Sequence, residues 1–373
     1  MNKKVVWSVV IVIIAIIIIA IVSKDPSNSG SKDTIIIGAT ESLTGSAAYY
    51  GESSRKGMDL GIDFLKKEYP NTAFEIYHED NQFNPKIAVD AYNKLRASYD
   101  IDAIITQNSP SAIVIEPLAK KDGILQMAVS ASAEKYTSPD DLSFRMTAGS
   151  NFEVMPMIEF INKNYKRVAI LYMNNEIGMS EASSLQKGLE KNSGLMIVSH
   201  DSFPVETNDF RTLLTKIKVG HPDAIYIAGL ASHINNFLKQ MKELDVSAKV
   251  LTFRTGEDPV LLSNSGELAE GVIFTSNFDP ESKDAEALRF VSDYENKYGQ
   301  KPDSYAAEGY EGMRFVGMAF AKCNRDYDCI KDYLINIKNY PTVFGNISFN
   351  NNGDIEYDFF LKTVKNGKFV KYE

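Results

Sequence analysis

Short β-branched runs alternate with helix-length amphipathic segments along most of this chain, and no other feature restricts its fold so strongly. Residues 34–39 (TIIIGA) form the first apolar run, and residues 51–69 then carry Met58, Ile62 and Leu65 at helical spacing. Strands that alternate with helices normally pair in parallel and are covered by helices on both faces. The pattern therefore predicts an α/β protein built on parallel sheets.

The alternation runs through two successive series. Strands of the first series are expected at residues 34–39, 74–77, 103–106 and 124–129, and its helices at 51–69, 85–99 and 111–120. The second series begins after Gly149 with a helix at 151–164, and its strands are expected at 168–172, 195–199, 224–228 and 250–253. A chain of 373 residues is too long for one ordinary domain. Two similar α/β domains are therefore predicted, with a break near Gly149.

The last hundred residues depart from this repeat. Two long helices, at 283–298 and 304–322, follow a strand expected at 272–275. Asn352-Gly353 then lies between two apolar runs, a pattern typical of a β-hairpin turn. This third part indicates a chain that passes between the two domains more than once.

Residues 5–22 form one apolar run in which Ser8 is the only clearly polar residue, preceded by Lys3 and Lys4. A helix of this length spans about 27 Å, which is close to the hydrocarbon thickness of a bilayer. We expect one N-terminal transmembrane helix with the body of the protein outside the cytoplasm. The flank after the run is a poor cleavage site, which favours an uncleaved anchor over a signal peptide, followed by a tether that ends at Asp33.

Cys323 and Cys329 are the only cysteines. In an exported protein a disulfide between them is expected, and the alternatives are two free thiols or half of a metal site. Because the four histidines are not near these cysteines, a zinc site is disfavoured. No metal and no cofactor is predicted.

Charge and motifs argue for binding rather than catalysis. The net charge of −9 disfavours nucleic acid as a partner. The chain has no Gly-x-Ser-x-Gly nucleophile elbow, no phosphate-binding loop, and no Gly-x-Gly-x-x-Gly after the first strand. We therefore expect that the protein is not an enzyme.

Small hydroxyl residues follow three of the predicted strands in the first series. They lie in residues 42–45 (SLTG), 107–111 (QNSPS) and 129–133 (VSASA). Ligands of doubly wound sheets bind beyond the carboxyl ends of the strands, where hydroxyls and helix N-termini can hold a carboxylate. Ordinary helix capping would also explain Ser109 or Ser111. Three such loops on one face favour a binding site.

Several short motifs follow one another from residue 34 to the C-terminus. They are the segments 37–39 (IGA), 43–45 (LTG), 122–124 (DGI), 130–132 (SAS), 207–210 (TNDF), 222–226 (PDAIY), 268–272 (LAEGV), 305–307 (YAA), 310–312 (YEG), 345–349 (GNISF) and 352–354 (NGD). Each is loose alone, but together and in this order they resemble the type I periplasmic binding proteins of branched-chain amino acid (Leu/Ile/Val) ABC transporters.

The resemblance implies two α/β lobes joined by three crossovers, with the ligand between them. It assigns residues 34–149 and 277–349 to the first lobe, and residues 150–276 and 350–373 to the second. Residues 1–33 remain as anchor and tether.

The resemblance also implies site residues. It places the ligand carboxylate on Ser109 and Ser132, beside the backbone of Ser130, and an aromatic contact at Tyr50. Family members usually carry an acid for the ligand's ammonium after the strand at 250–253, whereas this chain has Arg254 there.

Three interpretations of Arg254 remain open. It faces the cleft and binds an anionic group; or Glu257 takes the ammonium and Arg254 pairs with a surface acid; or Arg254 snorkels from the strand end.

Two functions follow from the resemblance. The first is a solute-binding protein that closes on an amino acid or related small carboxylate and docks on an ABC permease with its ATPase. The second is a ligand-sensing extracellular subunit that acts with a separate signalling partner. The oligomeric state and the exact ligand are not indicated.

Overall fold

The computed structural model describes residues 34–138 and 141–373. The expected transmembrane helix and tether at residues 1–33 lie outside this range. Within the described residues, none of the helices combines the length and the apolar character needed to cross a membrane.

The first lobe is built on a five-stranded sheet in the order β2-β1-β3-β4-β5, whose pairs between β1 and β3, β3 and β4, and β4 and β5 are parallel. Its strands are β1 (Thr34–Glu41), β2 (Ala73–Asp80), β3 (Ala103–Thr106), β4 (Leu125–Ala128) and β5 (Ser143–Arg145). Its helices are α2 (Ala48–Glu68), α3 (Pro85–Tyr99), α4 (Ser109–Asp122), α11 (Ala285–Tyr298), α12 (Ser304–Cys323) and α13 (Tyr327–Ile335). A short hairpin of β11 (Tyr340–Thr342) and β12 (Gly345–Ile347) accompanies them.

Helices cover both faces of this sheet, as the alternation predicts. Ile35 and Ile37 pack with Met58 of α2 in one apolar cluster, whereas Ile104 packs with Leu95 of α3 in another. Asn84 caps α3 as expected, because its side chain accepts from the backbone N–H groups of residues 86 and 87. The buried helix α12 lies close against α2, where a Cβ added at Gly57 would come within 2.0 Å of the carbonyl oxygen of Ala306.

The second lobe is built on a seven-stranded sheet in the order β14-β13-β10-β9-β8-β6-β7. Its strands are β6 (Arg167–Met173), β7 (Met196–Phe203), β8 (Ala224–Ala228), β9 (Lys249–Thr252), β10 (Ile273–Ser276), β13 (Phe360–Lys365) and β14 (Lys368–Lys371). Its helices are α5 (Ser150–Glu153), α6 (Met155–Asn164), α7 (Glu176–Leu189), α8 (Arg211–Val219), α9 (Ala231–Glu243) and α10 (Pro259–Ser265), with short 3-10 turns η1 (Arg254–Glu257) and η2 (Gly266–Ala269). Strands β6 to β10 pair in parallel, but β13 and β14 are antiparallel, so this sheet is mixed.

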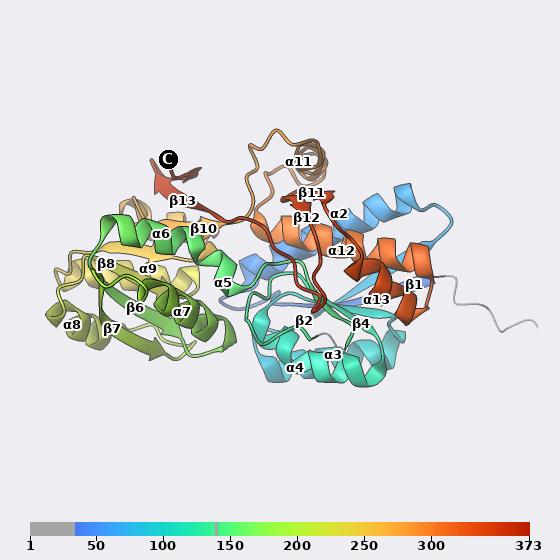
Figure 1. Ribbon diagram of the computed structural model, residues 1–373, viewed down its shortest axis with the longest axis horizontal. Helices are drawn as coiled ribbons and strands as arrows, with labels where there is room; N and C mark the ends of the chain where they lie inside the picture. The colour runs from blue at the N-terminus through green and yellow to red at the C-terminus, as the bar shows by residue number, and fades with distance from the viewer. Residues whose placement is uncertain (1–33, 139–140) are drawn as a thin grey trace, which may run out of the picture. The chain divides into compact units, whose positions relative to one another are not determined.

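Three segments carry the chain between the lobes, as Figure 1 shows. They join β5 to α5, β10 to α11, and β12 to β13. Three crossovers agree with the architecture that the resemblance implies, while the exact lobe boundaries, 34–149 with 277–349 and 150–276 with 350–373, stay a prediction.

Two local predictions were wrong. The single helix expected at 151–164 is divided at Val154 into α5 and α6, because Pro156 in the first turn of α6 has no N–H to continue the preceding helix. The hairpin expected at Asn352-Gly353 is reduced to one bridge between Phe349 and Ile355. The carbonyl of Gly353 instead accepts from the backbone N–H of Arg145, which holds this turn at the edge of the first sheet.

The C-terminal hairpin joins β13 to β14 through Asn366-Gly367. Both turn residues have positive φ, 52° and 66°, which is the signature of a type I′ turn. An Asn-Gly pair therefore forms a hairpin turn here but not at residue 352, because the chain must leave the first lobe soon after Ile355.

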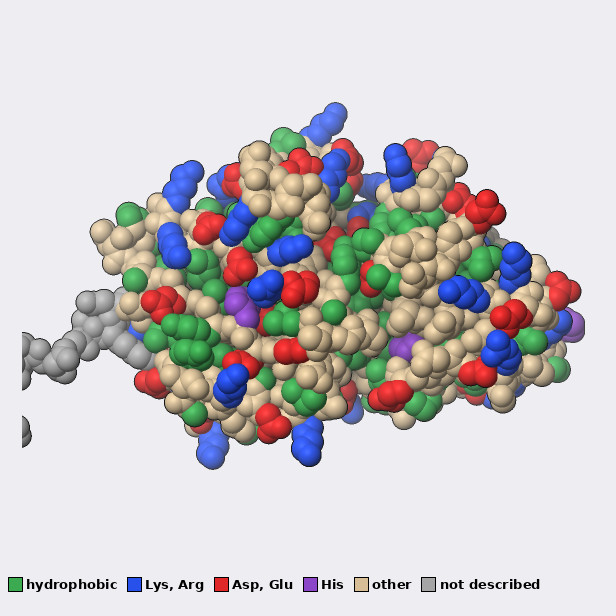
Figure 2. All heavy atoms as spheres, turned by 180° about the vertical axis from the view of Figure 1, so that it is seen from behind, with side chains coloured by type: hydrophobic (Ala, Val, Ile, Leu, Met, Phe, Trp, Pro, Cys, Tyr) green, Lys and Arg blue, Asp and Glu red, His purple; other side chains and the backbone are tan. Residues whose placement is uncertain are grey.

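Charges on the molecular surface are mixed. Figure 2 shows acidic and basic side chains interspersed over the face that it displays. The net charge of −9 is thus spread out rather than gathered into one acidic field on that face.

Candidate functional site

A small cavity lies between the two lobes, and residues from both form its walls. Its volume is about 40 Å³, room for only a few water molecules. The first lobe contributes Ala47, Tyr50, Phe83, Gln107, Asn108, Ser109, Ser130 and Tyr305, and the second contributes Met173, Ile177, Leu230, Phe253, Arg254 and Thr255. The walls differ in character, since hydroxyls and amides come mainly from the first lobe and large apolar side chains mainly from the second.

The polar wall is formed by the loops that follow β3 and β4. Asn108 caps α4, because its side chain accepts from the N–H of Ser111 at 2.9 Å. Ser109 is then the first residue of α4, and its hydroxyl oxygen accepts from the N–H of Ala133 at 3.2 Å. The N-terminus of a 14-residue helix and the Ser109 hydroxyl thus meet at the cavity wall.

A buried network holds this wall from behind. Ser42 donates from its hydroxyl to the Asn81 side-chain oxygen at 2.8 Å, and the Asn108 amide donates to Ser42 Oγ at 3.2 Å. Sequence reasoning chose the loops of Ser42 and Asn108 but selected neither residue. Asn81 directly follows β2, so its position at a strand end was the signal that could have found it.

Tyr50 joins the lobes. Its hydroxyl donates to the carbonyl oxygen of Thr255 and accepts from the N–H of Ala231, each at 3.1 Å. Burial raises the pKa of Tyr50 well above its usual value, so the hydroxyl keeps its proton. The ring lies 4.9 Å from the ring of Tyr305, measured between centroids.

Tyr305 belongs to one of the family-like motifs, 305–307, although the sequence did not indicate it as a site residue. It is 3% exposed and lines the cavity, and within the described residues its hydroxyl has no hydrogen-bond partner. An unsatisfied buried hydroxyl in a cavity wall is a group that a ligand could satisfy.

Arg254 crosses from the second lobe into the first. It is 2% exposed, and its Nη1 donates to Thr147 Oγ1 at 2.7 Å and to Glu308, while Nη2 donates to the carbonyl oxygen of Ser130 at 3.1 Å. Burial by itself lowers the pKa of Arg254, but Glu308 and Glu153 outweigh it and raise the pKa, so the guanidinium stays charged. Its partner is a buried acid, so neither snorkelling to water nor pairing with a surface acid describes it.

Glu308 is the main acceptor that sequence reasoning missed. It is fully buried and accepts from Ser130 Oγ at 2.6 Å and from the Asn277 amide at 2.8 Å, as well as from Arg254 and Thr147. Burial raises the pKa of Glu308, and Arg254 opposes that shift. Glu308 follows Tyr305 by three residues, so both lie on one face of α12. This helical spacing is the sequence pattern from which Glu308 could have been identified.

Ser132 and Glu257 do not line the cavity. Ser132 Oγ lies 3.5 Å from Glu181 Oε1, and burial together with the charge of Glu153 raises the pKa of Glu181 well above its usual value. Glu257 accepts from Ser304 Oγ at 2.7 Å and forms an ion pair with Lys362. The structure thus brings four of the six selected residues to the cavity, namely Tyr50, Ser109, Ser130 and Arg254, and leaves these two outside its lining.

The predicted disulfide is confirmed. Cys323 at the end of α12 is bonded to Cys329 in α13, with their Cα atoms 5.6 Å apart. The bond ties together two helices of the first lobe. Among the residues that the structure describes, no cluster of His, Cys, Asp and Glu could hold a metal ion.

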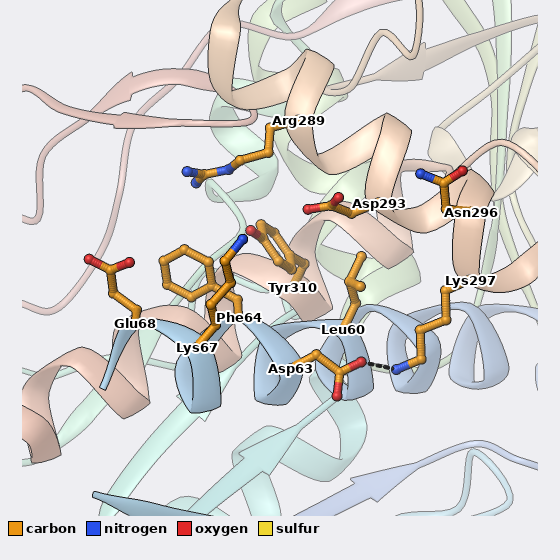
Figure 3. A pocket seen from close by; sticks show the side chains of 10 residues that line it. All are labelled: Leu60, Asp63, Phe64, Lys67, Glu68, Arg289, Asp293, Asn296, Lys297 and Tyr310. Atoms are coloured by element: carbon orange, nitrogen blue, oxygen red, sulfur yellow. Dashed lines mark hydrogen bonds and ion pairs between the residues drawn. The ribbon is translucent and has the colours of Figure 1, made fainter. Parts of the chain in front are cut away.

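A second, larger hollow opens on the surface of the first lobe. Figure 3 shows this groove between α2, α11 and α12. Its volume is about 510 Å³. Phe64 and Tyr310 lie at its base, and the guanidinium of Arg289 lies 5.3 Å from the centre of the Phe64 ring. Lys297 Nζ pairs with Asp63 Oδ2 at 2.6 Å across it.

Comparisons with known proteins agree on one family. Residues 34–368 match the family model described as periplasmic binding protein. The Leu/Ile/Val-binding protein BraC3 of Rhizobium johnstonii is 24% identical over 354 residues, which cover 91% of this chain and 94% of the relative.

Solved structures show the same fold. The branched-chain amino acid transporter substrate-binding protein LivJ of Streptococcus pneumoniae, in complex with isoleucine, superposes with a TM-score of 0.82 at 23% identity and covers 91% of this chain and 100% of that one. A solute-binding protein of an ABC transporter from Rhodopseudomonas palustris, in complex with 3,4-dihydroxybenzoic acid, gives 0.80 at 24% identity, with 91% and 96% covered. The matched family model and BraC3 are those of binding proteins, which agrees with the expectation that the chain is not an enzyme.

Proposed function

The chain belongs to the periplasmic binding protein family, and we propose that it serves as the extracytoplasmic solute-binding protein of an ABC importer. Its ligand is an amino acid or related small carboxylate, bound between lobes that close on it. The observation that carries this proposal is the interlobe cavity, which has a polar wall from one lobe and an apolar wall from the other. The named relatives that bind isoleucine or a dihydroxybenzoate support this range of ligands.

Four side chains of the cavity are our proposed ligand contacts. Tyr50, Ser109, Ser130 and Arg254 line it directly. Ser132 and Glu257, which were expected to touch the ligand, have the supporting role of holding the walls through Glu181 and Lys362.

Opening and closing of the lobes is part of the proposal. A cavity of about 40 Å³ is too small for an amino acid, so a ligand enters only after the lobes separate. The hydrogen bonds of Tyr50 and the ion pair of Arg254 with Glu308 cross between the lobes and would break on opening. Ligand contacts with both lobes then shift the population toward the closed form.

The rest of the proposal concerns location and partners. Residues 1–33, with their apolar run, would act as an uncleaved anchor that keeps the body beside an ABC permease and its ATPase outside the cytoplasm. This part depends on the sequence pattern and on the family alone.

The test is a thermal-shift screen of the purified full-length chain against amino acids, dicarboxylates, monocarboxylates and amides. We expect at least one carboxylate to raise the melting temperature, and isothermal titration to give one site per chain. Small-angle scattering should show a smaller radius of gyration with that ligand, and the groove variant Lys297→Gln should behave like the parent chain. If no carboxylate raises the melting temperature, the proposed function is wrong.

A further inference from the structure

The interlobe cavity offers no anionic group to a ligand. Of the residues that line it, Arg254 alone carries a charge at neutral pH, and none is a carboxylate. An ammonium group brought into this space would lose its hydration and would face a buried guanidinium instead of an acid. The cost of leaving a buried charge unpaired is high.

The two carboxylates that pair with Arg254 do not line the cavity. Glu308 accepts from Arg254, Thr147, Ser130 and Asn277. Glu153 Oε1 accepts from the backbone N–H of Arg254 at 3.3 Å and from Thr275 Oγ1 at 3.0 Å. Glu153 Oε2 has no hydrogen-bond partner among the described residues, but it lies 3.7 Å from Arg254 Nε as an ion pair.

Two backbone carbonyl oxygens of the lining residues are also engaged. The Ser130 carbonyl accepts from Arg254, and the Thr255 carbonyl accepts from Tyr50. A cationic ligand group would therefore compete with existing hydrogen bonds at these two oxygens.

Hydrogen-bond donors, in contrast, are left over. A guanidinium has five N–H groups, and Arg254 uses three of them in the hydrogen bonds to Thr147, Glu308 and Ser130. Its Nε lies 3.7 Å from Glu153 Oε2, so one N–H on Nη2 is left. The Tyr305 hydroxyl has no hydrogen-bond partner among the described residues. The Ser109 hydroxyl accepts a hydrogen bond from the N–H of Ala133, and this bond does not use the hydroxyl proton, which Ser109 can still donate. The N-terminus of α4 adds the favourable end of a helix dipole.

The remaining surface is apolar. Met173, Ile177, Leu230 and Phe253 form the wall of the second lobe, and Ala47 and Phe83 extend it from the first. Spare donors on one side and apolar side chains on the other match a molecule with an anionic head and an apolar body.

We infer that the ligand is a small monocarboxylate that lacks an ammonium group, for example a 2-oxo acid or an unsubstituted acid with an apolar body. This inference rests on the proposed function and narrows its ligand class. Arg254 supplies the positive charge, and its remaining N–H on Nη2 contributes to binding the carboxylate.

The experiment compares three matched pairs by isothermal titration on the full-length chain. They are alanine with pyruvate, leucine with 4-methyl-2-oxopentanoate, and phenylalanine with phenylpyruvate, and each pair differs only in the group on the α-carbon. In the pair that contains the tightest-binding compound, we expect the oxo acid to bind at least tenfold more tightly than its amino acid. If an amino acid binds as tightly as its oxo acid or more so, the inference falls and the proposed function stands. If none of the six binds, the inference falls, whereas the proposed function falls only if no carboxylate in the thermal-shift screen raises the melting temperature.

Two variants test Arg254 itself. Arg254→Gln alone leaves Glu308 and Glu153 without their cation and is expected to destabilise the fold, so the double variant Arg254→Gln with Glu308→Gln is made beside it. The double variant removes both charges; Gln keeps the shape of Glu308 and is shorter than Arg254. We expect it to melt within a few degrees of the parent chain and to lose at least tenfold in affinity for the oxo acid. An unchanged preference for the oxo acid in a folded double variant would overturn the role of Arg254.

Discussion

The interlobe cavity and the groove on the first lobe differ in nearly every respect. The groove is more than ten times larger, at about 510 Å³ against 40 Å³, but the ion pair between its lining residues Lys297 and Asp63 is partly exposed to water. Lys297 and Asp63 have side chains that are 34% and 53% exposed, whereas Arg254 and Glu308 have side chains at 3% and 0%. Size is therefore a poor guide to the site, and the degree of desolvation of the charges is a better one.

The largest expected effect comes from the buried pair. Replacing Glu308 by Gln removes the charge that faces Arg254 and should lower the free energy of unfolding by about 3–5 kcal/mol. Urea denaturation of the full-length chain measures this. The double variant with Arg254→Gln should recover most of the loss, and a single variant within 1 kcal/mol of the parent would contradict the importance of the pair.

The second effect concerns pH. Burial raises the pKa of Asp258, at the end of the loop that begins with Arg254, to about 6 from an ordinary value near 3.8. The folded state then prefers the protonated acid, so the stabilisation from protonation is complete below pH 3.8 and is lost as the pH rises through 6.

Asp258→Asn removes this titration while it retains the cap to the N–H of Val260. Relative to that variant, the parent chain should gain roughly 2–3 kcal/mol as the pH falls from 7 to 4. Urea denaturation at several pH values measures the difference, and parallel curves for the two proteins would show that Asp258 is not perturbed.

A smaller effect is expected at the contact between the lobes. Tyr50→Phe removes two hydrogen bonds and leaves the N–H of Ala231 without its partner, at a cost of about 2 kcal/mol. The affinity for the best carboxylate probe should fall by roughly tenfold to thirtyfold in isothermal titration, because the closed form is weakened. An unchanged affinity would mean that this contact does not help to hold the lobes closed on a ligand.

The smallest effect belongs to the groove. Lys297→Gln breaks the exposed pair with Asp63 and should change the free energy of unfolding by no more than about 0.5 kcal/mol. Ligand affinity should not change. A tenfold loss of affinity in this variant would reverse the comparison and assign the groove a role in binding.

Much of the fold could be predicted because its signals are local. The alternation of strands and helices, the cap at Asn84 and the disulfide of Cys323 with Cys329 each depend on residues close together in the chain. The helix break before Pro156 was equally local and was overlooked. The turn at residue 352 could not be read in this way, because its outcome depends on β5, more than two hundred residues away.

Only part of the candidate site could be predicted from the sequence. Loops at strand ends led to Ser109 and Ser130, since parallel strands bring their carboxyl ends to one edge. The sequence did not indicate Glu308 and Tyr305 as site residues, because they lie within helix α12 and not in a loop at a strand end. Ser132 and Glu257 were selected by position in the chain, but their side chains point to Glu181 and Lys362.

By itself, the sequence determined the two series of strands and helices, the pairing of the cysteines and the loops that carry the hydroxyls, because hydrophobic periodicity and turn chemistry act over a few residues. Only the tertiary structure decided that Arg254 meets Glu308, because α12 returns to the first lobe and presents its buried face across the cleft. An isolated Arg after a strand has many potential partners. Burial between the two lobes leaves it two acids, Glu308 and Glu153, because a desolvated guanidinium must find an acid within reach.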